Sequence, residues 1–286
     1  PPSIVLVLYG MIARQPVSQL WLAGIGPGLL MTVLFLAYIL IRCHINPKMG
    51  PVLPKSERNY SFKQKLRVLS AGIIPLLLIF SVIGSFFFGL TSLVESSAFG
   101  AFAAFLVALF RRRLTWKLFK KILRETLDNS AMFMWVMMAA LAFAAVFDGL
   151  GAVRALEGLF LNDWGLSPWQ VLLLMQLSFV VLGIFLDDTA MLVIVAPLYI
   201  PLVMKLGFNP IWFGILYTIT CQIAYITPPF GYNLFLMRAM SPKSITIRDI
   251  YASIIPFVGL MLLALVLIMI FPEIALYIPS LFNTKM

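Results

Sequence analysis

The chain has 286 residues, of which 62% are hydrophobic and only 11% carry a charge. Soluble globular domains carry about 25% charged residues, so this composition excludes that class. The net charge of +10 at pH 7 does not indicate a nucleic-acid partner, because the basic residues are confined to short segments between apolar runs. We therefore predict an all-α, polytopic membrane protein with the lipid bilayer around most of its length.

Four apolar runs without a charge are each long enough to cross roughly 30 Å of hydrocarbon as a helix that rises about 1.5 Å per residue. They span residues 20–41, 71–90, 130–147 and 250–271. Most of the 21 lysines and arginines lie in three segments, 42–67, 111–124 and 238–248. Cytoplasmic loops are enriched in these residues, so all three segments are expected inside and the C-terminus outside.

A short amphipathic segment, 114–127, precedes the third apolar run. Its apolar residues share one helical face, away from its lysines: Trp116, Phe119, Leu123 and Leu127. This pattern predicts a helix that lies in the cytoplasmic interface beside the spanning helix, with its cations toward the lipid headgroups.

The apolar stretch 168–205 divides near Asp187 and Asp188 into two arms of about fifteen residues, or roughly 22 Å as helices. We expect neither arm to cross the bilayer alone, and the residues that flank the stretch are expected outside. A re-entrant hairpin over 168–204, with its tip at mid-membrane, satisfies both conditions. The alternative is a pair of full spans with a cytoplasmic turn, which would place the basic segment 238–248 outside, against the charge rule.

The next apolar segment, 211–226, is followed by Pro228 and Pro229. Two prolines remove two backbone donors and disfavour helical geometry for the residue before each, so we expect the helix to break here and to resume over 232–240. In lipid, a broken backbone survives only where protein or a water-lined cavity satisfies its free polar groups. A hairpin tip followed by a broken helix therefore predicts one buried polar site.

The N-terminus repeats this arrangement. Pro1 and Pro2 precede a helix to Ala13, a polar turn and a second helix that contains Pro27, as the later proline pair precedes a helix, a turn and Pro256. On the charge-based topology the two copies run in opposite directions. Inverted repeats with broken helices are typical of secondary transporters.

Ionisable side chains inside apolar segments are costly and usually functional. Here they are Glu95, Asp187 and Asp188, and hydroxyl and amide groups near the last two add neutral oxygen atoms. Such hard ligands suit alkali and alkaline-earth cations, which makes sodium coupling the natural hypothesis. The structural interpretation is that Asp187 or Asp188 caps the second arm and that Glu95 caps a helix at the outer interface. Cys43 and Cys221 are expected to be packing residues.

Several motifs stand together in this chain: Gly183-x-Phe185-x-Asp187-x-x-Ala190, Trp212-Phe213-Gly214, Thr227-Pro228-Pro229-x-Gly231-x-Asn233 and, near the start, Pro1-Pro2-Ser3-Ile4. In combination they resemble the large membrane subunit of TRAP transporters, the DctM-like family, within the wider group of ion-coupled elevator carriers. The resemblance covers essentially the whole chain, although residues 91–98 follow the family's Thr-Pro-Thr-Glu-Ala-Ala pattern only loosely. The family's first hairpin precedes the Pro-Pro-Ser-Ile break, so we expect this chain to be an N-terminally truncated fragment.

The resemblance implies a secondary transporter, not an enzyme, that takes up a small organic anion together with Na⁺ by an elevator mechanism. It implies sodium binding by Gly183, Asp187, Asp188, Thr189, Thr227, Pro228, Gly231 and Asn233. It implies substrate binding by Pro2, Ser3, Asp187, Thr227 and Pro229. The expected partners are a small four-helix membrane subunit and a periplasmic substrate-binding protein. The expected location is the bacterial inner membrane, with a periplasmic C-terminus.

The same resemblance divides the chain into a transport domain and a scaffold. The transport domain is expected to comprise the second half of the first broken helix, 1–13, and the second repeat, 128–240, with the re-entrant hairpin 168–204 and the broken helix 211–240. The scaffold is expected to comprise residues 14–127, with the cytoplasmic amphipathic helix, and the C-terminal helix, 241–286.

Two other functions stay open at this point. An intramembrane aspartyl protease also uses buried carboxylates, but it needs two aspartates on separate facing helices that share a proton, whereas Asp187 and Asp188 are adjacent. A channel would need a ring-forming filter or a long polar helix face, and the sequence shows neither pattern.

Overall fold

The computed structural model describes residues 3–50, 61–88, 90–228, 231–242 and 244–283. These residues form helices and no strand, which confirms the predicted all-α class. Within them, five helical stretches are long and apolar enough to cross a membrane, as expected for a polytopic protein. They are Val17–Ile45, Trp116–Phe147, Pro168–Phe185, Asp188–Lys205 and Ile247–Ile270.

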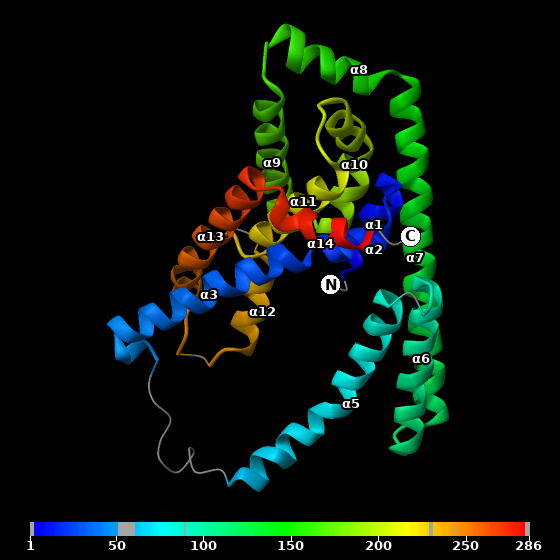
Figure 1. Ribbon diagram of the computed structural model, residues 1–286, viewed down its shortest axis with the longest axis vertical. Helices are drawn as coiled ribbons and strands as arrows, with labels where there is room; N and C mark the ends of the chain where they lie inside the picture. The colour runs from blue at the N-terminus through cyan, green and yellow to red at the C-terminus, as the bar shows by residue number, and fades with distance from the viewer. Residues whose placement is uncertain (1–2, 51–60, 89, 229–230, 243, 284–286) are drawn as a thin grey trace. The chain divides into compact units, whose positions relative to one another are not determined.

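The helices follow one another along the chain as Figure 1 labels them. The first are α1 (Ile4–Ala13), α2 (Val17–Ala23), α3 (Ile25–Ile45) and the 3₁₀ turn η1 (Pro47–Met49). Next come α5 (Phe62–Phe87), α6 (Leu93–Phe110), α7 (Trp116–Gly149), α8 (Ala152–Glu157) and the π-helical turn η2 (Gly158–Asp163). The last are α9 (Pro168–Phe185), α10 (Asp188–Lys205), α11 (Pro210–Tyr225), α12 (Tyr232–Met240), α13 (Ile247–Ile270) and α14 (Glu273–Asn283).

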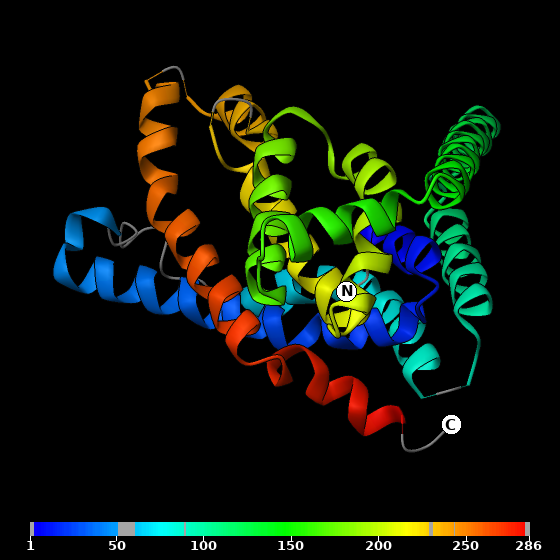
Figure 2. The same cartoon turned by 90° about the horizontal axis from the view of Figure 1, so that it is seen from above.

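The chain forms two compact units, one of residues 1–41 with 134–286 and one of residues 42–133. The larger unit is built around α11, which contacts α1, α2, α9, α10 and α13. Figure 2 shows α11 in the middle of this unit, with α13 along one side of it and α1 on another. Twelve of the sixteen residues of α11 are buried, so its neighbouring helices cover most of its surface.

Two hydrogen bonds from buried aromatic side chains fix α11 within the larger unit. The hydroxyl of Tyr9, in α1, donates to the Pro210 carbonyl at the start of α11 over 2.6 Å. The indole Nε1 of Trp212 donates to the Ile268 carbonyl of α13 over 2.9 Å. A Cβ on Gly214 would lie 2.5 Å from the Tyr9 ring, so a glycine at this position is what lets α1 approach α11.

The smaller unit contains α5 and α6, which pack against each other. The start of α6 is closed by a capping box: the Ser92 N–H donates to Glu95 Oε2 over 2.7 Å, and the Glu95 N–H donates to Ser92 Oγ over 3.3 Å. Each partner satisfies a backbone donor that the first turn of a helix leaves free. The interpretation of Glu95 as a helix cap is therefore confirmed.

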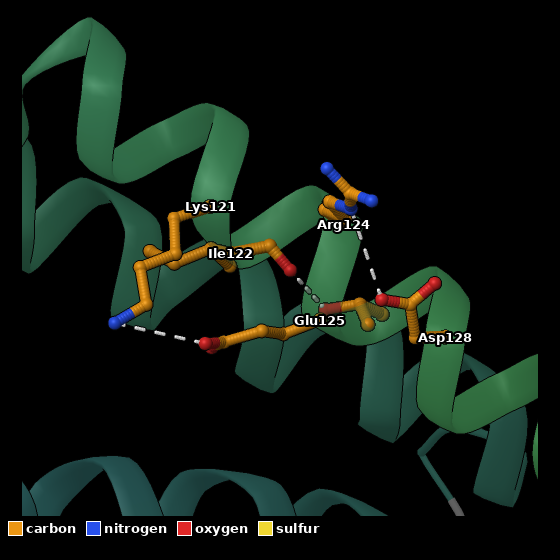
Figure 3. A network of polar contacts seen from close by, with 6 residues as sticks. Lys121, Ile122, Arg124, Glu125 and Asp128 are labelled. Carbon is orange, nitrogen blue, oxygen red and sulfur yellow. Dashed lines mark hydrogen bonds and ion pairs between the residues drawn. The ribbon is translucent and has the colours of Figure 1, made fainter.

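α7 differs from the expectation for its first half. It is one helix of 34 residues, about 51 Å long by its rise, where the sequence pattern predicts an interfacial helix beside a spanning one. The polar residues between the two parts continue the helix: Lys121 pairs with Glu125 at 3.7 Å and Arg124 with Asp128 at 4.0 Å (Figure 3). Opposite charges four residues apart favour a helix, so the prediction of two separate elements is wrong.

Candidate functional site

The tip between α9 and α10 consists of two extended residues, Leu186 and Asp187. Leu186 has φ −111° and ψ 149°, and Asp187 has φ −70° and ψ 160°. The Leu186 N–H still donates to the Leu182 carbonyl over 2.8 Å, which completes α9, and Asp188 begins α10. The predicted division of this apolar stretch at its two aspartates is therefore confirmed.

The two arms are longer than the sequence analysis predicts. α9 and α10 have 18 residues each, or about 27 Å by helical rise, because the helices continue to within two residues of each other and leave almost nothing for a loop. Both arms have the length and composition of a spanning helix. Length therefore does not separate a re-entrant hairpin from two full spans. The hairpin now depends on the sidedness of the charges and stays a prediction.

The helix break after α11 is confirmed, since α11 ends at Tyr225 and α12 begins at Tyr232. On the first side of the break, the Thr227 hydroxyl donates to the Ile223 carbonyl over 2.6 Å. On the second side, the Gly231 N–H donates to the Thr227 carbonyl over 3.1 Å. These two local bonds give hydrogen-bond partners to some of the backbone groups that lose their helical partners at the break.

A cavity of about 500 Å³ is lined by residues of both the tip and the break. Five of the predicted sodium ligands line it: Gly183, Asp187, Asp188, Gly231 and Asn233. Three others, which the structure also describes, are not part of its lining: Thr189, Thr227 and Pro228. The described lining residues include two carboxylates and no lysine or arginine, so the charge in this cavity favours a cation.

The predicted substrate residues are more scattered than the predicted sodium ligands. Asp187 lines the cavity at the tip, whereas Ser3 lines a second cavity of about 320 Å³ beside α3 and α11. The Ser3 side chain also caps α1, since its Oγ accepts from the Leu6 N–H over 3.4 Å. Pro2 and Pro229 lie outside the described residues.

The two aspartates at the tip differ in how their carboxylates contact α10. Asp187 occupies the N-cap position of α10, but its side chain makes no capping hydrogen bond. The prediction that an aspartate caps the second arm is therefore wrong for Asp187. The Asp188 carboxylate accepts from the Thr189 hydroxyl over 3.3 Å. Both residues lie at the N-terminus of α10.

Two tyrosines of α11, which no motif marks, contact the tip. The Tyr217 hydroxyl donates to the Asp188 carbonyl over 2.6 Å, and the Asp188 N–H donates to the Tyr225 hydroxyl over 3.4 Å. With Cys221 they follow one another at four-residue spacing, which places them on successive turns of one helix face. This polar stripe directly before the break is the sequence signal that could have identified them.

Comparison with known proteins gives a family match for nearly the whole chain. Residues 1–274 match the family described as Tripartite ATP-independent periplasmic transporter, DctM component. The chain is 30% identical to the C4-dicarboxylate TRAP transporter large permease protein DctM of Pseudomonas aeruginosa, over 98% of this chain and 64% of that protein. It is 31% identical to the sialic acid TRAP transporter permease protein SiaT of Haemophilus influenzae, over 98% of this chain and 44% of that protein.

A third relative is named for a different substrate. The chain is 27% identical to the ectoine TRAP transporter large permease protein TeaC of Halomonas elongata, over 98% of this chain and 64% of that protein. The chain thus spans less than two thirds of the length of each of these curated relatives.

Proposed function

Because this chain belongs to the DctM family of tripartite ATP-independent periplasmic (TRAP) transporters, a family of transporter components rather than enzymes, we propose that it is part of a carrier that takes up a small organic anion together with Na⁺. The proposal places it in the bacterial inner membrane with a periplasmic C-terminus. A small four-helix membrane subunit stands beside it, and a periplasmic binding protein delivers the anion. The relatives are named for C4-dicarboxylates, sialic acid and ectoine, so the family membership does not select one substrate.

The observation that supports this proposal is the cavity lined by Asp187, Asp188 and Asn233. Two neighbouring carboxylates repel each other and any anionic substrate. A bound cation removes both repulsions, because it becomes the largest local charge and reverses the sign of the field around it. Sodium binding at the tip therefore favours anion binding nearby, and by linkage the anion favours sodium to the same extent.

The ligand chemistry of the cavity agrees with an alkali cation. The polar side chains that line it are the carboxylates of Asp187 and Asp188, the amide of Asn233 and the phenol of Tyr225, whose oxygens are hard ligands. In the proposal, the five lining residues named above hold Na⁺. Thr189, Thr227 and Pro228 lie next to them along the chain and complete the site when the tip closes on the ion. The proposed elevator movement carries the hairpin and the broken helix together, and the contacts of α11 with both α9 and α10 support their motion as one body.

Transport into proteoliposomes tests this function. The full-length permease is reconstituted with its membrane partner, and uptake of labelled anion, supplied by the binding protein, is measured with and without a sodium gradient. We expect uptake to require sodium and expect Asp187→Asn and Asp188→Asn each to abolish the sodium dependence, because each removes a charged ligand but keeps the side-chain shape. Asp163→Asn is the matched control, since Asp163 is an exposed aspartate in η2 and not a lining residue.

Two results would overturn the proposal. One is uptake by the wild-type protein at the same rate with sodium, with potassium and without a gradient. The other is an unchanged sodium affinity in both aspartate variants.

A further inference from the structure

Among the hydrogen bonds that the structure describes, those between the backbone of the tip and side chains of α11 are made at Asp188. Its carbonyl accepts the Tyr217 hydroxyl at 2.6 Å, and its N–H donates to the Tyr225 hydroxyl at 3.4 Å. Both polar backbone groups of the first residue of α10 are thus bonded to side chains of another helix. These bonds fix the position of the tip with respect to α11.

The N-cap side chain of α10 makes no capping bond, and one N–H of the first turn is bonded to α11 instead. The first N–H groups of a helix have no partner within it and are usually satisfied by the N-cap side chain. Asp187 is the N-cap residue of α10, yet its carboxylate makes no such bond. Tyr225 accepts the N–H of Asp188, so a neutral hydroxyl satisfies one of the free donors of the first turn, while the Asp187 carboxylate, without a capping bond, lines the cavity.

The ring of Tyr217 is held in place by the other arm of the hairpin. Its ring centroid lies 4.8 Å from that of Phe179 in α9, with the planes at 76°, and Phe179 lies 5.4 Å from Tyr199 in α10. Tyr217 is 1% exposed. Tyr225 lines the cavity itself. The two hydroxyls therefore project from a packed helix face to the turn that carries both carboxylates.

We propose that Tyr217 and Tyr225 are positioning residues of the ion site, which orient the tip carboxylates by fixing the backbone of Asp188. This inference depends on the proposed sodium site. Neither hydroxyl needs to touch the ion. Removal of a hydroxyl leaves the rings packed but lets the tip shift, so that the ion must order the turn when it binds and binds more weakly as a result.

The size of the effect follows from the two distances. One hydrogen bond of ordinary strength corresponds to a change of about twofold to tenfold in an equilibrium constant. Tyr217→Phe removes the 2.6 Å bond and is expected at the upper end of this range. Tyr225→Phe removes the 3.4 Å bond and is expected at the lower end.

Tyr9→Phe provides a matched control for these two variants. Tyr9 is also 1% exposed, and its hydroxyl also donates over 2.6 Å to a backbone carbonyl of α11, but at Pro210, at the opposite end of the helix from the tip. A purely structural loss of one buried hydroxyl should therefore affect Tyr9→Phe and Tyr217→Phe alike.

The experiment measures the affinity of the purified full-length permease for Na⁺, with potassium as the reference salt, from the rise of its unfolding temperature as sodium is added. We expect Tyr217→Phe and Tyr225→Phe to weaken sodium binding by the factors above. We expect Tyr9→Phe to keep the wild-type sodium affinity. In the absence of sodium, Tyr217→Phe and Tyr9→Phe should unfold at similar temperatures.

The outcomes separate this inference from the proposed function. If the wild-type protein binds sodium, Asp187→Asn abolishes binding, and both tip tyrosine variants retain the wild-type affinity, the positioning role is overturned and the sodium site stands. If the wild-type protein does not bind sodium, the site itself fails. Should Tyr217→Phe not fold, the half-buried Tyr225 provides the decisive variant, because its ring is less tightly packed.

Discussion

Replacing Gly183 with alanine tests how closely α9 and α11 must approach each other at the tip. A Cβ on Gly183 would lie 2.7 Å from the Ala224 Cβ, and 3.7 and 3.9 Å from the end of the Met191 side chain. Two carbon atoms in contact prefer a separation of about 3.5 to 4.0 Å. The two helices would therefore have to move apart by about 1 Å, and the lining of the cavity would move with them.

The stability cost of Gly183→Ala can be isolated with a second substitution, Ala224→Gly, that makes room for the new Cβ. Overpacking of this kind costs about 1 to 3 kcal/mol. Ala224→Gly costs about 1 kcal/mol by itself, because glycine is a poor helix former, but it removes the carbon that obstructs the new Cβ. In the double variant the clash is gone, and the alanine introduced in α9 recovers about as much helix propensity as α11 loses. We therefore expect the double variant near wild-type stability, whereas additive effects would place it about 1 to 3 kcal/mol lower, because the two propensity changes cancel and the overpacking cost would remain.

Thermal unfolding of the purified permease and its variants in one detergent measures these differences. Gly259→Ala, in α13, is the control, since a Cβ there meets no atom within 4 Å and alanine is expected to leave stability unchanged or to raise it by up to about 1 kcal/mol. The reasoning is refuted if Gly183→Ala is as stable as this control. It is also refuted if the double variant shows the sum of the two single losses.

Two further predictions concern polar contacts of the larger unit. Gln176 is buried and accepts a 2.7 Å hydrogen bond from Thr220, while its Nε2 has no partner in the described structure. Thr220→Val should destabilise the protein by about 1 kcal/mol, because it leaves both polar atoms of the Gln176 amide unpaired, whereas Gln176→Leu should be nearly neutral. Equal losses of stability in thermal unfolding would contradict this. Lys205 forms an ion pair with Glu157, with side chains 41% and 34% exposed. Lys205→Gln should cost less than about 1 kcal/mol, and a loss that does not shrink between low and high salt would contradict the assignment.

The features that could be predicted from the sequence depend on local chemistry. Pro228 interrupts its helix wherever the chain places it, because a proline lacks the N–H and disfavours helical geometry just before it. Asp187 and Asp188 divide their apolar stretch for a similar reason, since charges in such a stretch mark a turn or a site. The cap formed by Glu95 is likewise confined to one helical turn. Signals of this kind do not need knowledge of which helices are neighbours.

The features that could not be predicted depend on a balance between signals that end a helix and signals that continue it, or on contacts between residues far apart in the sequence. Residues 125–130 are polar enough to end a helix, and only the pairing of Lys121 and Arg124 with acidic residues one turn ahead shows that α7 continues. The bond between Tyr217 and Asp188 joins residues 29 apart on different helices. Its existence follows from the packing of α11 against the hairpin, which no local pattern contains.

The bond from the Trp212 indole to the Ile268 carbonyl has a consequence for any sliding of α11 along α13. Trp212 is 2% exposed, so water cannot replace a lost acceptor, and a buried N–H without a partner costs about 1 to 3 kcal/mol. The Ile268 carbonyl lies in the last turn of α13, and Pro272, four residues further, has no N–H to donate to it, whereas carbonyls one turn earlier are bonded within the helix. Relative travel of these two helices would therefore break this bond without offering the indole another free carbonyl of α13.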